Sequence, residues 1–545
     1  MFTLPTYLFH RPAELDRPLS RTHPVIIVGA GLSGLTAALD LVRRGVRVLL
    51  LDDDNTVGVR GLASRGMVWA QRTLDIFDRL GVAERIVAKG VRWNVGRVLC
   101  CDKPVTSFTL QDQPDVRHNG FANLQQYYVE QFLVEALQRE PLAELRWLNK
   151  VSTVRIVEEG VELEVETPEG SYRTRAQWLV AADGAASGVR AALGLKPEVY
   201  DRTEDRWIII DIILRNQEWP EERWTWLDAG ANGGRAVWRH KMADDTWRLD
   251  FQLAPDEDPA MACTEAAMRA RVARLVGDEV GFDIAWSGAW AYRHECLPQL
   301  RHGPVLFIGD AAHLVAPFGA RGGNGGIQDA DNLGWKLALH LQGQAGETLL
   351  DSYGCERKHA ALENIRQARR ASRFVYPAGQ NSARLWRDAI IALAPSHDWA
   401  ARMINTGRLC MPALYPGSAL ACPGHALAGA ALPNVVLRRE GARAPLTLHG
   451  LLGPWFTALV LSDGLPANAP AHPLLHWAAV GSHCDAAGRA ALARQLKTDA
   501  LDGSICLVRP DHHVMAVLPA PQVHEIVHWL QQAVAQPQPE YSAEA

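Results

Sequence analysis

The stretch that most constrains the fold lies near the N-terminus, at residues 24–54, and reads PVIIVGAGLSGLTAALDLVRRGVRVLLLDDD. A β-branched run leads into Gly29, Gly31 and Gly34, and an apolar helical pattern and a second apolar run follow. This order predicts a strand, a tight turn, a helix and a strand, with glycines where a pyrophosphate must approach the backbone. Asp52 closes the second strand, where a carboxylate can accept hydrogen bonds from ribose hydroxyls. The stretch predicts a dinucleotide site but leaves FAD and NAD(P) open.

Length, charge and cysteine content limit the number of domains, the partners and the compartment that the protein can have. A chain of 545 residues predicts about two to four domains. The net charge of −5 argues against nucleic acid as a partner. Nine cysteines without a CxxC motif suggest neither a disulfide framework nor a zinc site, and favour reduced thiols in a cytoplasmic protein. The N-terminus has no signal-peptide pattern, and the apolar run at 24–42 is better explained by the dinucleotide motif than by a membrane span.

Two later segments have the features expected of partners of the stretch at 24–54 in one binding site. Asp183–Gly184 and Gly309–Asp310 each follow an apolar strand and precede a helix or a glycine-rich loop. Each is therefore expected at the carboxyl end of a strand, which is where ligands bind in open α/β sheets.

The remaining pattern divides the chain coarsely. We expect an extended arm (1–21), strands (91–110), a helix (121–137), strands with a turn at 168–170 (145–180), an antiparallel sheet (206–253), a helix and loop (260–285), a loop with five glycines (319–326), a helix (356–374), a loop-rich stretch (376–430) and a separate C-terminal domain (431–535).

These three motifs, in this order, resemble those of the single-component flavoprotein aromatic hydroxylases, typified by p-hydroxybenzoate hydroxylase. The resemblance covers about residues 22–375 and implies an α/β fold: a Rossmann-like FAD-binding domain with an inserted antiparallel-sheet substrate domain. LQQYYVE and NGGIQDADNLGWKLA look closest to 3-(3-hydroxyphenyl)propionate hydroxylase-like members, whose C-terminal extension is thioredoxin-like and lacks redox cysteines. The implied parts are the FAD-binding domain (22–195), the substrate sheet (196–300), the FAD-binding return segment and long helix (301–395), a linker (396–430) and the thioredoxin-like domain (431–535).

The resemblance also implies which residues contact FAD. Gln125 and Gln126 are register alternatives for one contact near the ribityl chain. The implied cofactor-binding set is Gly29, Gly31, Gly34, Asp52, Arg65, Gln125, Gln126, Asp183, Gly184, Arg190, Gly309, Asp310, Pro317, Gly322, Gly323 and Asn324. Amides at the start of the helix after Pro317 can stabilise negative charge on the reduced flavin ring.

For the family, NAD(P)H reduces FAD, O2 forms a C4a-hydroperoxide, and an OH is transferred to a phenol or another electron-rich ring. The expected partners are a small aromatic substrate, NAD(P)H and O2, in aromatic compound catabolism, with neither nucleic acid nor membrane and with a homodimer left open. The inserted sheet mixes aromatic and polar residues as an aromatic-acid pocket would. The expected substrate residues are Trp226, Trp238, His240, Arg248, Asp250, Phe251 and Phe318, and the catalytic candidates are His313, Pro317 and His240.

Three other functions are compatible with a flavin-binding fold of this kind. A flavin-dependent halogenase needs W-x-W-x-I-P, whereas residues 224–228 read WTWLD. A reductase of the same fold, acting on an alkene, would share the motifs without O2-coupled hydroxylation. A non-catalytic flavin-binding protein would bind FAD without turnover. His313 has a structural alternative of its own, and the sequence names neither the substrate, nor a base that deprotonates it, nor NADH over NADPH.

Overall fold

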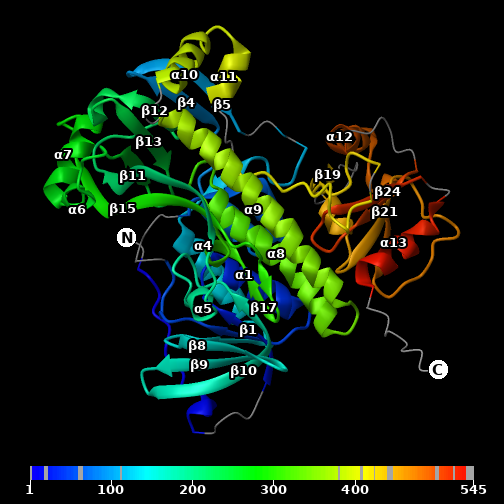
Figure 1. The fold of residues 1–545 in the computed structure, drawn as a ribbon. Coiled ribbons are helices and arrows are strands. Elements are labelled where there is room, and N and C mark those ends of the chain that lie inside the picture. Colours follow the sequence, from blue (N-terminus) through cyan, green and yellow to red (C-terminus); the bar gives the residue numbers. More distant parts are fainter. Residues whose placement is uncertain are drawn as a thin grey trace.

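The protein is described here as a computed structural model. It describes residues 3–16, 22–58, 66–110, 113, 115–377, 381–404, 409–422, 424–437, 446–496, 503–519 and 522–535, with only the backbone at 202–204 and 381. The fold is α/β with mixed sheets (Figure 1). No helix in these ranges has both the length and the apolar character needed to cross a membrane.

A central sheet carries the first motif. Its strands run in the order β16-β17-β10-β1-β2-β7, and β17, β10, β1, β2 and β7 are parallel. The predicted strand-turn-helix-strand is confirmed as β1, α1 and β2. The bounds are β1 (Thr22–Val28), α1 (Leu32–Arg43), β2 (Val48–Leu51), β7 (Ala143–Arg146), β8 (Lys150–Val157), β9 (Gly160–Thr167), β10 (Gly170–Ala181), β16 (Arg301–His302) and β17 (Val305–Phe307). The predicted hairpin turn at 168–170 joins β9 to β10.

Helices cover this sheet, and two long ones, α8 and α9, lie side by side (Figure 1). α8 also packs against α1, so the first motif contacts a helix almost 300 residues later. A small pair of strands, β3 and β6, lies nearby. The bounds are β3 (Val68–Ala70), α2 (Gln71–Arg79), α3 (Ala83–Lys89), β6 (Phe121–Asn123), α4 (Gln126–Leu137), α5 (Gly188–Ala192), α8 (Arg321–Leu341) and α9 (Glu347–Val375).

A second sheet of eight strands has the order β18-β15-β11-β14-β13-β12-β4-β5. All its pairs are antiparallel except β12 with β4. Two strands of the stretch predicted to belong to the FAD-binding domain, β4 and β5, therefore extend this sheet instead. The bounds are β4 (Val95–Cys100), β5 (Lys103–Thr109), β11 (Glu198–Leu214), β12 (Arg223–Ala229), β13 (Arg235–Lys241), β14 (Thr246–Gln252), α6 (Pro259–Ala262), α7 (Glu265–Val276), β15 (Phe282–Cys296) and β18 (His313–Leu314).

The C-terminal part contains a four-stranded sheet in the order β22-β21-β23-β24. β21 pairs parallel with β22 and antiparallel with β23. The bounds are β19 (Val436–Leu437), β20 (Leu446–Thr447), β21 (Phe456–Val460), β22 (Leu475–Ala479), α12 (Ala486–Leu496), β23 (Ile505–Val508), β24 (Val514–Leu518) and α13 (Glu525–Val534).

Buried charges join this C-terminal part to α8 and α9. Arg509 donates to Glu356 Oε1 at 2.6 Å and to Asp511 Oδ2 at 2.5 Å, and Lys336 Nζ lies 2.8 Å from Glu356 Oε2. All four side chains are almost fully buried. Since removing one partner leaves an uncompensated buried charge, this network couples the stability of the two parts.

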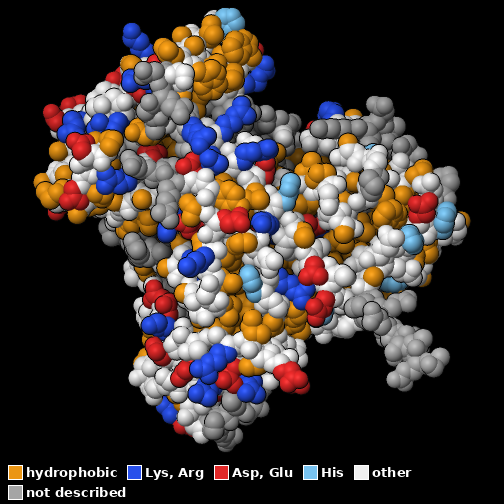
Figure 2. Space-filling model, viewed as in Figure 1, with side chains coloured by type: hydrophobic (Ala, Val, Ile, Leu, Met, Phe, Trp, Pro, Cys, Tyr) orange, Lys and Arg blue, Asp and Glu red, His pale blue; other side chains and the backbone are white. Residues whose placement is uncertain are grey.

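Three expectations about elements are wrong. Residues 121–123 form β6, so the helix predicted from 121 begins at Gln126. The glycine-rich segment, predicted as a loop, is helical from Arg321. Its glycines let α8 pack closely on α1, since a Cβ at Gly326 would lie 2.2 Å from Ser33 Oγ. The stretch 376–430 contains two helices, α10 (Asn381–Leu393) and α11 (Asp398–Ile404). Hydrophobic side chains gather over these two helices on the face shown in Figure 2.

Candidate active site

A cavity of about 1060 Å³ lies where the carboxyl edge of the central sheet faces the second sheet. The three sequence motifs meet in it. Its lining includes Gly29, Gly31, Asp52, Gln126, Asp183, Gly184, Asp310, Pro317, Gly322, Gly323 and Asn324, together with Trp238, His240, Arg248, Asp250 and Phe318. One continuous space therefore joins the predicted dinucleotide positions to the predicted substrate positions.

The glycines of the first turn have different steric roles. Gly29 has φ of +103°, and a Cβ there would lie 2.5 Å from the Ala182 carbonyl oxygen. A Cβ at Gly34 would lie 1.9 Å from the Gly29 carbonyl oxygen. Gly31 lines the cavity, and the nearest atom to an added Cβ is Glu130 Oε1 at 3.9 Å. Gly29 and Gly34 are thus required by the fold, whereas Gly31 keeps the backbone accessible to a ligand.

Two buried carboxyls lie beside this turn. Asp52 accepts hydrogen bonds from the backbone N–H groups of Ala30 and Asp54, and burial raises its pKa to about 6. Glu130 on α4 accepts from the Gly58 N–H and from Gln126 Nε2, both at 2.7 Å, and burial raises its pKa to about 7. Glu130 was not predicted from the sequence, although it lies one helical turn after Gln126 and on the same face.

Arg190 ties the second motif to the third. Asp183 Oδ2 accepts the Val189 N–H at 3.0 Å at the start of α5. Arg190 donates to the Ala311 carbonyl at 2.9 Å and the Ala185 carbonyl at 2.6 Å. Arg190 is therefore not part of the cavity lining and holds the two lining segments together.

Asn324 fixes the start of α8 at the cavity. Its Oδ1 accepts from the Ala70 N–H at 3.0 Å, and its Nδ2 donates to the Val68 carbonyl at 2.7 Å. Gly322 and Gly323 lie in the same first turn and line the cavity. Backbone N–H groups at a helix N-terminus carry partial positive charge, so this turn can stabilise an anion.

The second sheet presents alternate residues to the cavity, as strand geometry requires. The alternating lining positions are Arg223, Thr225 and Leu227 on β12, Trp238 and His240 on β13, and Arg248 and Asp250 on β14, whereas β15 contributes the continuous run 289–293, which includes Trp290 and Tyr292. Trp238 and Phe318 meet edge to face with centroids 5.2 Å apart. Aromatic walls with a few polar groups suit a flat aromatic ligand.

The charged and polar side chains of this wall differ in how many hydrogen-bond and ion-pair partners they have. Arg248 donates to Asp250 at 2.8–3.1 Å. His240 lies 3.7 Å from Asp250, and burial, with Arg223 and Arg248 nearby, holds its pKa well below the usual value. Arg223 is half-buried and forms no ion pair with a carboxylate among the described residues. Loss of solvent lowers its pKa to about 10, and the nearby charge of Asp250 offsets this only in part. Arg223 was not predicted from the sequence either, although its period-two spacing with Thr225 and Leu227 was a usable signal.

Several predicted site residues lie elsewhere. Trp226 and Phe251 are on the opposite face of the second sheet, in a core with Met268 and Val272 of α7. They were assigned to the pocket by residue type, although strand alternation places them with Trp224 and Leu249 on that face. Gln125 donates to the Ala243 carbonyl instead of lining the cavity, which favours Gln126.

His313 is also outside the cavity lining. Its Nε2 lies 2.7 Å from Asp329 Oδ2, and Asp329 also accepts from the Gly309 N–H and Arg357. This is the structural alternative for His313, with a carboxylate instead of loop carbonyls as its partner. Gly34 and Gly309 shape the backbone behind the cavity. Arg65 lies outside the described residues.

Comparison with known proteins defines the class. A family model described as "FAD binding domain" matches residues 22–368, so the chain belongs to this family of FAD-binding proteins. FAD is accordingly the dinucleotide of the first motif. The cavity suits it, because an open glycine turn, a carboxyl after β2 and the N-terminus of α8 lie along one continuous space.

Individual proteins similar to this chain are flavoprotein hydroxylases and monooxygenases. The chain is 30% identical over 374 residues to a 3-(3-hydroxy-phenyl)propionate/3-hydroxycinnamic acid hydroxylase of Mycolicibacterium smegmatis, covering 67% of this chain and 64% of the relative. The protein of that name from Mycolicibacterium gilvum is 28% identical over 471 residues, covering 84% and 79%. The flavin-dependent monooxygenase PieE, solved with FAD and substrate, shares the fold with a TM-score of 0.79, at 23% identity over 95% of this chain and 100% of PieE. The resemblance to flavoprotein hydroxylases is confirmed.

Proposed function

We propose that this protein is an FAD-dependent monooxygenase that uses NAD(P)H and O2 to hydroxylate a phenolic aromatic compound, in aromatic catabolism. The observation that carries the proposal is one continuous cavity, which joins the dinucleotide turn to an aromatic wall with a partly compensated arginine. The names of the relatives support the reaction type.

In this proposal, the chain holds FAD along the central sheet. Gly29, Gly31 and α1 approach the pyrophosphate, and Asp52 accepts hydrogen bonds from the adenosine ribose. Gln126, Asp310 and the first turn of α8 bind the ribityl chain and ring, with Pro317 beside the ring. These assignments are supported by the positions of the residues along the cavity.

Bound FAD would supply the electron transfer and oxygen activation of the reaction. The chain's own residues position the substrate and exclude water. Trp238, Phe318 and Tyr292 form the apolar walls, and the first turn of α8 stabilises negative charge on the ring. His240 is neutral near pH 7, since its pKa is held low, so it can accept a hydrogen bond from a phenol hydroxyl but is a weak base.

Charge indicates the substrate class within the phenols. Arg223 is half-buried, and Asp250 offsets its charge only in part, so an anionic ligand in the cavity would stabilise it further. We therefore assign Arg223 to an anionic group of the substrate, with Arg248 held by Asp250 beside it. A phenol bearing a carboxylate side chain fits this wall, which is consistent with the substrates named for the relatives.

The experiment that tests the function follows NAD(P)H and O2 consumption by the purified FAD-loaded protein with a panel of phenols. The panel includes 3-(3-hydroxyphenyl)propionate, its uncharged amide and the analogue without the ring hydroxyl. The expected result is faster, O2-dependent NAD(P)H oxidation with a product one oxygen heavier. NAD(P)H oxidation that is coupled to reduction of an alkene and needs no O2 would favour a reductase. FAD binding without any turnover would favour a non-catalytic protein.

We also propose that residues 431–535 form a thioredoxin-like domain with a packing role. The mixed four-stranded sheet with α12 and α13 supports this fold. The absence of a CxxC motif and the buried ion pairs of Arg509 support packing over redox chemistry. We likewise propose that the second sheet, which contains β11 to β15 and is enlarged by β4 and β5, forms the substrate domain.

A further inference from the structure

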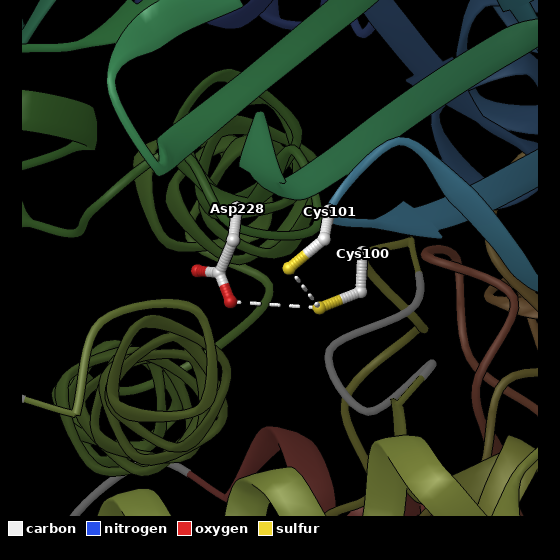
Figure 3. A group of neighbouring side chains, drawn as sticks. All are labelled: Cys100, Cys101 and Asp228. Carbon is white, nitrogen blue, oxygen red and sulfur yellow. Dashed lines mark hydrogen bonds between the residues drawn. The ribbon is translucent and has the colours of Figure 1, made fainter. Parts of the chain in front are cut away.

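Two adjacent cysteines and a distant aspartate converge at one end of the second sheet. Cys100 ends β4, Cys101 follows in the turn to β5, and Asp228 comes from β12, which pairs with β4. Figure 3 shows the three side chains pointing toward one another. Their ligand atoms all lie within 4.8 Å of one another. No step of the proposed hydroxylation uses this cluster, and it is separate from the cavity lining.

Two of the three ligand–ligand distances match a tetrahedral metal ion, and the third, between Cys101 Sγ and Asp228, is within 4.8 Å. The two Sγ atoms are 3.9 Å apart, and Cys100 Sγ lies 3.5 Å from Asp228 Oδ2. Zinc–sulfur bonds of about 2.3 Å at a tetrahedral angle place two thiolates about 3.8 Å apart. A zinc–oxygen bond of about 2.1 Å places sulfur and oxygen about 3.6 Å apart. With three protein ligands, a four-coordinate ion takes water as its fourth.

The surroundings hold the ligands in place and balance the charge. Arg387 on α10 donates to Asp228 Oδ1 at 2.7 Å, so Oδ2 is the oxygen directed at Cys100. Two thiolates, one carboxylate and one guanidinium sum to two negative charges, which a divalent cation neutralises. Outer partners of this kind orient metal-ligating carboxylates.

The backbone of the turn adds a separate observation. Cys101 and Asp102 have φ of 48° and 62°, the left-handed conformation that a two-residue hairpin turn requires. Asn and Gly usually occupy such positions, and a non-glycine residue there costs roughly 1 kcal/mol. This turn places the Cys101 thiol beside Cys100 instead of directing it away from the sheet.

We propose that Cys100, Cys101 and Asp228 form a binding site for a thiophilic divalent cation of the zinc type. The ion ties the β4–β5 turn to β12. Val98 and Leu227, close neighbours of the ligands along these strands, line the cavity, so the ion braces one wall of the substrate pocket. The sequence alone predicts no metal here because Asp228 is far from the cysteines along the chain.

The test uses the FAD-loaded protein, treated with a chelator and a non-thiol reductant, and titrated with Co²⁺ and then Zn²⁺. We expect one equivalent of Co²⁺ to give thiolate and tetrahedral bands, the latter to the red of the flavin absorption, and Zn²⁺ to displace it. Cys101→Ser removes an exposed ligand with little risk to folding and should abolish the bands. Asp228→Asn should weaken binding at least tenfold.

Cys355→Ser is the matched control, since Cys355 is an exposed cysteine on α9 outside the cluster. It should leave the Co²⁺ spectrum and stoichiometry unchanged. The proposal is overturned if the reduced protein gives no thiolate–cobalt absorption, or if Cys101→Ser gives the wild-type spectrum. It is equally overturned if thiol titration shows that the two cysteines form a disulfide and metal fails to bind after reduction.

Discussion

At the scale of single residues, the cavity is defined by charges that the protein itself does not fully compensate. Arg223 and Glu130 are the clearest cases, one at each end. Glu130 is buried and Arg223 is half-buried, and neither was identified from the sequence. Groups with shifted pKa values in a cavity are candidates for functional positions, because perturbed pKa values cluster at functional sites.

Arg223→Met should raise KM for a carboxylate-bearing phenol by about 30-fold or more, because about 2 kcal/mol or more is lost with one partner of a buried charge pair. KM for the uncharged amide should change little. Arg215→Met, at an exposed ion pair with Asp283 near the edge of the same sheet, is the control. Steady-state kinetics with both substrates makes the comparison, and an equal loss for the two would contradict the assignment.

Glu130 should make stability depend on pH. Its pKa rises from 4.5 to about 7 on folding, so its contribution is fully present below pH 4.5 and is lost as pH rises through 7. The size is on the order of 3 kcal/mol. Glu130→Gln lacks this dependence, so its unfolding temperature should rise relative to wild type between pH 4.5 and 7. A difference that stays constant over this range would count against the assignment.

At the scale of elements, some glycines are required by close packing and others are not. Gly34 belongs to the first kind and Gly354 to the second. Gly34→Ala should destabilise the protein and deplete FAD, because its Cβ would lie 1.9 Å from the Gly29 carbonyl oxygen. Gly354→Ala on α9, where a Cβ meets nothing within 4 Å, should stabilise by about 0.5–1 kcal/mol. Thermal unfolding and flavin content per chain measure both variants. Full FAD occupancy in Gly34→Ala would refute the steric argument.

The elements also show what the sequence could predict. The β1–α1–β2 unit was predictable because strand, turn and helix signals are local there. The Asp183–Gly184 and Gly309–Asp310 segments were predictable because each follows an apolar strand. The start of α8 was not, since glycines disfavour helix, and only the structure shows that Gly323 and Gly326 pack against Leu32 and Ser33 of α1.

Placement across the sheet was harder to predict. Residue type alone selected Trp226 and Phe251, although alternation along β12 and β14 puts both on the face away from the cavity. That β4 joins β12 depends on pairing between segments more than a hundred residues apart. Local patterns carry no information about such a pairing.

At the scale of the whole molecule, buried charges join the C-terminal part to the FAD-binding helices. Arg509→Met should destabilise the protein by about 3–5 kcal/mol, since Glu356 and Asp511 lose their buried partner. Arg489→Met, at an exposed pair with Asp463 in the same C-terminal part, should cost less than about 1 kcal/mol. Calorimetric unfolding of both variants tests this, and equal effects would mean that the network contributes little.

The position of β1 in the middle of the central sheet has a consequence for synthesis. One of its neighbours, β10, ends at Ala181, the next strand, β17, ends at Phe307, and Arg509 completes the buried network. At about 5–20 residues per second, translation leaves the N-terminal turn without these partners for roughly tens of seconds. The nascent chain must therefore stay unpaired without aggregating, and flavin can be captured only once the first turn of α8 has left the ribosome.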